Sequence, residues 1–513
     1  MRRLLMRFGI LISVLALSSA AAQEPFPGLD AYIAKALQAS KIPGIAVAIV
    51  RNDSVLYTKG FGVLAAGSTT PVDDQTLFEI GSSSKSFTAT LVAMMVADGK
   101  MRYDDRITQY LPDFKLYDPL ASAELTVRDA LTHRAGLSRG ELIWLGSGAT
   151  RAEVLHRVRF LKPQSPFRSR YSYQNIMVLA AGEAAGKAAG TSWDDLLKQR
   201  IFVPLGMRSS VSTMVGLPTR TFAAPHGMAG DSVYVKPHSN MDNIGPAGSI
   251  ISNARDMAQW LRFQLADGVY DGKRLVSSAA LRETHTPQIL MGGGGGRGGA
   301  ADSMPTSHFS TYGMGWIIED YRKELVWQHG GNTDGMTTAM GVMPEQKFGV
   351  VVLSSMLSAQ LPAQLMRYIF DRQLHAQPRD LVADLLARAQ RQRPDSGTVV
   401  QAGARAAGES QVPLSAFVGT YADSMYGEAT VSMKDGRLEL VRGEWRGPLE
   451  YWNATNFRWT VLPSSPTGPM FMKFEVSPDN RVTGLYFGLA GDQSLLARKG
   501  AAGGGRGRGR GGS

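Results

Sequence analysis

Cysteine is absent from the 513-residue sequence, which excludes disulfide bonds, thiolate metal sites and a cysteine nucleophile. Any covalent catalysis must therefore use an oxygen or nitrogen nucleophile. After the N-terminal leader, the sequence also lacks an apolar run of the ~20 residues that a membrane-spanning helix needs. We therefore expect no integral membrane segment once that leader is removed.

Metal and nucleotide motifs are missing as well. The sequence contains no H-E-x-x-H, no clustered His/Asp pattern and no G-x-x-x-x-G-K-[ST]. The glycine run from Gly292 to Gly299 lacks the strand and helix that flank a dinucleotide fingerprint, and it resembles a disordered surface loop instead. We predict that the protein uses no metal and no cofactor.

Strong charge of one sign is also lacking from the body of the chain. The net charge of the whole chain is +11, but six of its arginines lie in the leader and in a glycine-rich tail. Without these six arginines, the body of the chain carries about +5. This excess is too small to indicate a nucleic-acid partner.

The N-terminus has the three-part layout of a secretory signal. A basic segment ending at Arg7 is followed by an apolar stretch from Phe8 to Leu17 and by small residues up to Ala22. We expect cleavage near Ala22 and export to the periplasm or the extracellular space.

The length of the chain predicts one large domain and a smaller one, because a single core rarely organises so many residues. The large domain begins with a helix and a hairpin, continues through a mainly helical middle and ends in strands, which predicts an α+β fold with one antiparallel sheet. The smaller region has short alternating strands separated by turns, as in a β-sandwich or barrel. The expected divisions are a signal peptide at 1–22, the large domain at 23–371, a helix and linker at 372–411, the β-domain at 412–500 and a disordered Gly/Arg tail at 501–513.

Individual elements are expected from apolar periodicity. We expect helices near 29–37, 82–98, 256–264 and 365–370. We expect a strand at 44–50, a turn at Asn52-Asp53 and a second strand that ends near Gly60. Further strands are expected at 313–318, 325–328, 337–342 and 349–353.

Ser82 and Lys85 form an S-x-x-K motif at the start of a predicted helix. Residues three apart share one helix face, so the amine can lie against the hydroxyl. A serine needs such a neighbour, since its hydroxyl is unreactive at its free pKa, and the helix N-terminus adds positive potential. Alone the motif is weak, because an N-cap serine beside an exposed lysine would look the same.

Two further motifs follow in order. Tyr173 and Asn175 form Y-x-N, and His329-Gly330-Gly331-Asn332 precedes a predicted strand. Together the three motifs resemble those of the serine β-lactamase and penicillin-binding-protein superfamily, most closely its class C β-lactamase-like branch. The resemblance covers roughly residues 30–370 and implies a β-lactamase-like fold with a helical subdomain. The C-terminal β-domain resembles the lipocalin-like module that often follows such domains.

The resemblance implies a role for each motif residue. Ser82 would attack a carbonyl, Lys85 would assist its deprotonation, and Tyr173 would act as general base and then general acid. Asn175 would orient the substrate and Lys85, and the backbone N–H groups of Ser82 and Asn332 would form the oxyanion hole. His329, Gly330 and Gly331 would line the substrate site.

One departure from the family pattern concerns specificity. β-Lactamases and penicillin-binding proteins usually carry Lys-Thr-Gly where this chain has His329-Gly330-Gly331. A mostly neutral imidazole and a glycine offer a carboxylate less than an ammonium and a hydroxyl do. The departure favours a peptidase or esterase over a β-lactamase.

Several alternatives remain open. Gly136 to Gly140 fits the G-x-S-x-G nucleophile elbow around Ser138, although the strand and helix that an elbow needs are not evident. His133 is expected to be structural.

The sequence thus predicts an exported serine hydrolase for small peptide, amide or ester substrates, of D-aminopeptidase or esterase type. The alternatives are a true β-lactamase or D,D-carboxypeptidase and a silent cell-wall-binding or penicillin-binding protein; the oligomeric state is not predicted.

Overall fold

The computed structural model describes residues 24–215, 217, 221–291, 308–357, 359–380, 382–384, 405, 410–461, 470–488 and 493–500. The expected signal peptide, the glycine run at 292–299, the C-terminal tail and most of the expected linker lie outside these residues. Within the described ranges, no helix is long and apolar enough to cross a membrane.

The large domain is built on an eight-stranded antiparallel sheet, in the order β2-β1-β14-β13-β12-β11-β10-β9. β1 pairs with β14, so the start of the domain is joined to its end. The strands are β1 (Gly44–Arg51), β2 (Ser54–Gly62), β9 (Ile289–Leu290), β10 (Ser310–Tyr312), β11 (Ile317–Tyr321), β12 (Glu324–Asn332), β13 (Thr337–Met343) and β14 (Phe348–Ser354).

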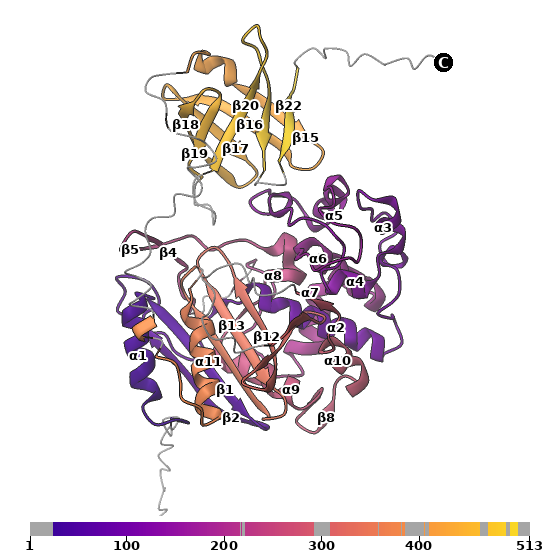
Figure 1. The fold of residues 1–513 in the computed structure, drawn as a ribbon, viewed down its shortest axis with the longest axis vertical. Coiled ribbons are helices and arrows are strands. Elements are labelled where there is room, and N and C mark those ends of the chain that lie inside the picture. Colours follow the sequence, from indigo (N-terminus) through magenta and orange to yellow (C-terminus); the bar gives the residue numbers. More distant parts are fainter. Residues whose placement is uncertain are drawn as a thin grey trace, which may run out of the picture.

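Helices cover both faces of this sheet (Figure 1). α1 (Leu29–Ser40) and α11 (Leu361–Gln373) share a core with Ile45, Val47 and Ile49 of β1. The alternate residues of β1, among them Ala46 and Ala48, belong to the second core with the central helices. Because side chains alternate across a strand, a wholly apolar β1 serves both cores.

The second layer is mainly helical. α2 (Ser84–Ala97) is buried from Ser84 to Met95 and packs against α6 (Asn175–Ala189). The other helices are α3 (Pro119–Glu124), α4 (Val127–Leu131), α5 (Arg151–Arg157), α7 (Trp193–Leu197), α8 (Gly245–Gly248), α9 (Ala254–Leu265) and α10 (Ser278–Thr284). Short turns of helix are η1 (Gly81–Ser83), η2 (Ile107–Gln109), η3 (Glu141–Ile143), η4 (Val158–Phe160), η5 (Lys198–Phe202) and η6 (Asp242–Ile244). Three strand pairs are β3 (Phe78–Glu79) with β6 (Ile251–Ser252), β4 (His226–Ala229) with β5 (Ser232–Val235), and β7 (Val269–Tyr270) with β8 (Lys273–Arg274).

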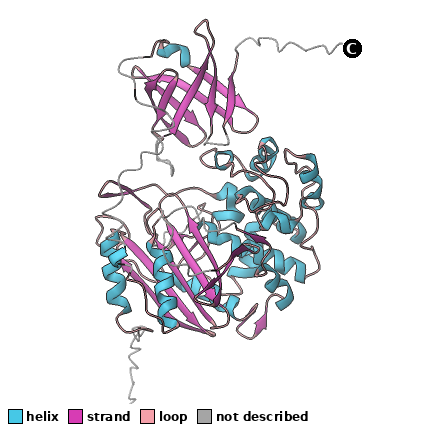
Figure 2. Ribbon diagram, viewed as in Figure 1, coloured by secondary structure: helices cyan, strands magenta, loops and turns pink. Residues whose placement is uncertain are grey.

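The C-terminal domain is a closed barrel of eight strands, drawn in orange to yellow in Figure 1 and shown in Figure 2 as strands with one short helical turn. Strand β22 pairs with β15 and closes it. After the turn η7 (Leu414–Phe417), the strands are β15 (Gly419–Asp423), β16 (Gly427–Lys434), β17 (Arg437–Arg442), β18 (Trp445–Asn453), β19 (Asn456–Trp459), β20 (Met470–Val476), β21 (Val482–Phe487) and β22 (Ser494–Arg498).

The predicted α+β fold with an antiparallel sheet and a small all-β domain is confirmed. The helix expected from about Ser82 to Asp98 is present, with η1 as its first turn and α2 beginning at Ser84. One local prediction was wrong. The strand expected at 313–318 is broken between β10 and β11, because Gly315 turns with φ +74° against the backbone carbonyl of Lys85.

Candidate active site

Ser82 lies in η1, where the sheet meets α2. It is partly exposed, whereas Ser83 and the side chains that follow are buried. The turn brings β12 very close, since a Cβ on Gly331 would stand 1.9 Å from the carbonyl oxygen of Ile80. Ser82 is thus presented to solvent from a tightly packed junction.

Two proton-carrying groups contact the Ser82 hydroxyl. Lys85 Nζ lies 2.8 Å from Ser82 Oγ, and Tyr173 OH lies 2.7 Å from the same oxygen. Lys85 also donates to the carbonyl of Ala247 at 2.8 Å. Ala247 belongs to α8, so η1, α2, α8 and the segment before α6 converge on one oxygen and one amine.

The two groups are shifted in opposite directions by their surroundings. Burial, with a smaller contribution from the Arg139 charge, lowers the pKa of Lys85 well below its usual value. Burial raises the pKa of Tyr173, against the opposing effects of its hydrogen bond to Ser82 and of Arg139. The environment therefore favours a neutral amine and a protonated phenol.

His133 holds the backbone on both sides of Tyr173. Its carbonyl accepts from Ser172 N at 2.7 Å, and its Nδ1 accepts from Gln174 N at 3.1 Å. The imidazole is buried and lies 4.4 Å from the Tyr173 ring, centroid to centroid. Burial lowers the pKa of His133 well below its usual value, so the ring is neutral and its Nδ1 can accept from Gln174 N. These contacts agree with the structural role expected of it.

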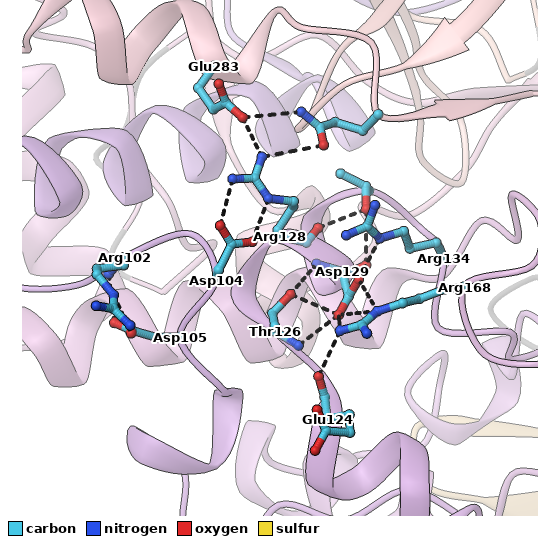
Figure 3. A network of polar contacts seen from close by, with 12 residues as sticks. Arg102, Asp104, Asp105, Glu124, Thr126, Arg128, Asp129, Arg134, Arg168 and Glu283 are labelled. Carbon is cyan, nitrogen blue, oxygen red and sulfur yellow. Dashed lines mark hydrogen bonds and ion pairs between the residues drawn. The ribbon is translucent and has the colours of Figure 1, made fainter.

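A buried carboxylate braces the two segments that carry His133 and Tyr173 (Figure 3). Asp129, which is fully buried, binds Arg134 at 2.5 Å and Arg168 at 2.6 Å. Arg134 follows His133 directly, and Arg168 N donates to the Arg134 carbonyl at 2.8 Å. Thr126 and Asp129 also cap each other at the start of α4.

The backbone amides proposed for the oxyanion hole lie at the same junction. A Cβ on Gly81 would stand 2.7 Å from Asn332 N, and one on Gly331 would stand 2.9 Å from Ser82 N. Gly81 and Gly331 therefore leave the room in which these two N–H groups come together beside Ser82. Gly330 is the neighbouring β12 residue and pairs with Ala339 of β13.

His329 is 3% exposed, and both of its nitrogens have protein partners. Nε2 lies 3.0 Å from Tyr312 OH, and Nδ1 lies 2.6 Å from the Gly330 carbonyl. Burial lowers the pKa of His329 to about 3. This position favours support of β12 over the direct substrate contact expected from the sequence.

Asn175 faces an ion pair that the sequence did not suggest. Its Nδ2 lies 3.4 Å from a carboxylate oxygen of Glu141, and Glu141 binds Arg139 at 2.5 Å. The Arg139 guanidinium lies 4.9 Å from the centre of the Tyr173 ring. Among the described residues, the buried Oδ1 of Asn175 has no hydrogen-bond partner and is available as an acceptor.

The alternative nucleophile Ser138 is 9% exposed, and it lies in a loop between a single bridging residue, Leu137, and the turn η3. It therefore lacks the strand and helix of a nucleophile elbow. Within the described ranges, no three His, Asp or Glu side chains are grouped so that they could hold a metal ion.

Comparison with known proteins gives two family matches. The Beta-lactamase family model matches residues 29–398, and a Domain of unknown function (DUF3471) matches residues 404–495.

Curated relatives match about three fifths of this chain. The "Unguisins hydrolase ungD" of Aspergillus violaceofuscus is 28% identical over 63% of this chain and 59% of its own length. "Penicillin-binding protein 4" of Amycolatopsis lactamdurans is 28% identical over 59% of this chain and 78% of its own. The chain spans about three fifths of the length of the first curated relatives, 59% and 63%.

Among solved structures, the octameric penicillin-binding protein homologue from Pyrococcus abyssi matches with a TM-score of 0.59 at 22% identity, over 91% of this chain and 99% of its own. D-amino acid amidase from Ochrobactrum anthropi SV3 matches with a TM-score of 0.55 at 22% identity, over 71% and 99%. At these identities the likeness concerns the fold.

Proposed function

Since the chain belongs to the Beta-lactamase family and is a serine hydrolase, we propose that it cleaves small peptide, amide or ester substrates through an acyl-enzyme on Ser82. The observation that carries this proposal is the position of Ser82 Oγ, 2.8 Å from Lys85 Nζ and 2.7 Å from Tyr173 OH. A hydroxyl between a buried amine and a phenol can be deprotonated and can pass its proton on.

The proton of Ser82 goes first to Lys85. The resemblance assigned the general base to Tyr173, but burial favours the neutral amine of Lys85 and the protonated form of Tyr173. Lys85 accepts the proton as Ser82 Oγ bonds to the substrate carbonyl carbon. The oxygen that becomes negative accepts from the N–H groups of Ser82 and Asn332.

Tyr173 then protonates the leaving group. As the C–N or C–O bond breaks, the phenol gives its proton to the departing nitrogen or oxygen, and the ammonium of Lys85 restores the phenol. The ring of Tyr173 lies 4.8 Å from Lys85 Nζ and 4.9 Å from the guanidinium of Arg139, so two cations stabilise the transient phenolate. Water finally hydrolyses the acyl-enzyme, and Ser82 regains its proton.

The His-Gly-Gly segment supports amide or ester substrates over β-lactams. His329 is buried, and in the described structure its nitrogens are engaged with Tyr312 and Gly330, so its ring offers no charge to a substrate carboxylate. The name of the relative "Unguisins hydrolase ungD" agrees with a hydrolytic activity.

Hydrolysis of a substrate panel tests the proposal. The panel contains a p-nitrophenyl ester, D- and L-aminoacyl amides, a D-Ala-D-Ala peptide and a chromogenic cephalosporin. We expect turnover of the ester or the aminoacyl amides by the wild type and none by Ser82→Ala. Cleavage of the cephalosporin alone would identify a β-lactamase, and no cleavage at all would identify a silent binding protein.

We further propose that the protein works outside the cytoplasm, on the basis of the basic, apolar and small-residue segments that end at Ala22. N-terminal sequencing of the protein recovered from the periplasm or the medium should begin near Gln23. Recovery of the uncleaved chain from the cytoplasm alone would contradict this.

A further inference from the structure

We propose that the C-terminal barrel positions the active site of the large domain. Arg442 of the barrel holds η3 by hydrogen bonds, and we call this contact the clamp. In turn, η3 keeps Glu141 beside Asn175 and Arg139 beside Tyr173. The inference rests on the proposed function, because it takes Tyr173 and Asn175 to be part of the reaction site. Arg442 is a positioning residue in this account and does not touch the substrate.

The clamp is made by a buried guanidinium at the end of β17. Arg442 is 2% exposed and donates to the carbonyls of Leu142 and Leu145, the latter at 3.2 Å. A third bond, to the Tyr426 carbonyl at 3.2 Å, anchors it in the barrel. Burial lowers the pKa of Arg442 only to about 10, so the group is charged at neutral pH. Charged donors make strong hydrogen bonds, and here they join two domains.

The two domains also interlock where this clamp lies. A Cβ on Gly146 would stand 2.2 Å from the ring of Trp445, and one on Gly443 would stand 2.4 Å from the backbone of Ser147. The backbone N–H of Glu444 donates to the Gly146 carbonyl at 3.1 Å. These close contacts, which leave no room for a side chain at Gly146 or Gly443, fix how the barrel meets the loop after η3.

The path from this joint to the reacting groups is short. Leu142, whose carbonyl Arg442 holds, follows Glu141 directly in the chain. The Glu141 carboxylate binds Arg139 and faces Asn175 Nδ2 at 3.4 Å. A shift of η3 would therefore move the partner of Asn175 and the cation above Tyr173 together. Small displacements at such a site are costly to the rate.

The barrel could instead act by touching the substrate through Glu444. This exposed side chain lines a cavity of about 280 Å³ at the domain joint, together with Trp144, Arg151 and Asp242. The two modes are separable, because Glu444 lines the cavity, whereas Arg442 is buried and does not line it.

The test compares Arg442→Ala with Arg442→Lys, Glu444→Ala and Arg446→Ala in the full-length chain, with kcat, KM and pH profile measured on the best panel substrate. Arg446 is exposed on β18, only four residues from the clamp, and is the matched control. We expect Arg442→Ala to lower kcat about tenfold or more with a smaller change in KM, and to alter the pH profile, since Arg139 and Glu141 act on Lys85 and Tyr173. Arg442→Lys should recover part of the loss, and Arg446→Ala should match the wild type.

A double-mutant cycle with Glu141→Gln identifies the route. If Arg442 acts through Glu141, the two losses are not additive. If Arg442→Ala does not fold, Arg442→Lys takes its place in the cycle. Hydrogen exchange should be faster at residues 140–147 in Arg442→Ala and unchanged in α2. A folded Arg442→Ala with wild-type kinetics and pH profile, strictly additive losses, or a KM effect confined to Glu444→Ala would overturn the proposal. A wild type that is inactive and unlabelled at Ser82 would instead refute the proposed function, and hydrogen exchange would still decide whether Arg442 holds η3.

Discussion

Tyr173 OH lies 2.7 Å from Ser82 Oγ, although the two residues are 91 positions apart in the chain. The contact depends on the backbone around Tyr173, which His133 holds from both sides, and on the turn η1, which Gly81 and Gly331 allow. The S-x-x-K and Y-x-N motifs are each weak signals in the sequence, but the fold places Ser82 and Tyr173 in direct contact.

Lys85→Arg tests whether a neutral amine is needed. Arginine keeps the positive charge but does not lose its proton in proteins, so we expect the variant to be as inactive as Lys85→Ala. For the wild type, the acid limb of kcat/KM should have its midpoint below the usual lysine pKa of 10.5, because burial lowers the pKa of Lys85. Substantial activity in Lys85→Arg would mean that Lys85 supplies only charge.

Tyr173→Phe removes the proposed proton donor to the leaving group. We expect kcat to fall about 100- to 10,000-fold, the usual contribution of a general acid or base. The fall should be smaller for a p-nitrophenyl ester than for an aminoacyl amide, because p-nitrophenolate leaves without a proton. Equal losses on both substrates would contradict this role.

The sequence predicts the site only where contacts are local or recur within a family. The three-residue spacing of Ser82 and Lys85 is a local relationship, and the order of the motifs identified Tyr173 and Asn175. The roles of Arg139, Glu141 and Ala247 come from contacts between distant segments, which one chain read alone does not show. Arg442 is the extreme case, because it belongs to none of the sequence motifs, yet it is 2% exposed and joins the two domains.

Asp129→Asn should destabilise the large domain. The variant leaves Arg134 and Arg168 without their buried carboxylate. Because both guanidinium groups are partly exposed and can regain water, we expect the free energy of unfolding to fall by about 3 kcal/mol. Asp104→Asn is the matched control, since Asp104 pairs with Arg128 but is 67% exposed, and its loss should cost less than about 1 kcal/mol. Urea unfolding at pH 7 measures both, and equal stabilities would contradict the bracing role of Asp129.

The same carboxylate contributes to acid sensitivity. Burial alone would raise the pKa of Asp129, but hydrogen bonds from Arg168 and Thr126 and the charge of Arg134 lower it below its usual 3.8. A carboxylate whose pKa is lower in the folded state stabilises the fold fully at pH values above its pKa in the unfolded chain. This stabilisation is lost as the pH falls through the pKa of the folded state.

His285 should add a second loss of stability on acidification, at a higher pH than the loss due to Asp129. Its ring stacks on Trp327 at 3.8 Å, and burial lowers its pKa from 6.5 to about 3. Between these values the unfolded chain binds a proton that the folded chain does not, so stability falls as the pH drops from 6.5 toward 3. His285→Phe keeps an aromatic ring for the stack and should flatten this slope by about one proton in urea unfolding between pH 4 and 7. An unchanged slope would show that His285 is not the group responsible.

Covalent labelling with a serine-directed reagent shows whether Ser82 is the nucleophile. The wild type, Ser82→Ala and Ser138→Ala are treated with a fluorophosphonate, and the labelled peptide is identified by mass spectrometry. We predict one label, on Ser82, in the wild type and in Ser138→Ala, and none in Ser82→Ala. A label on Ser138, a label that survives in Ser82→Ala, or no label on the wild type would contradict the account.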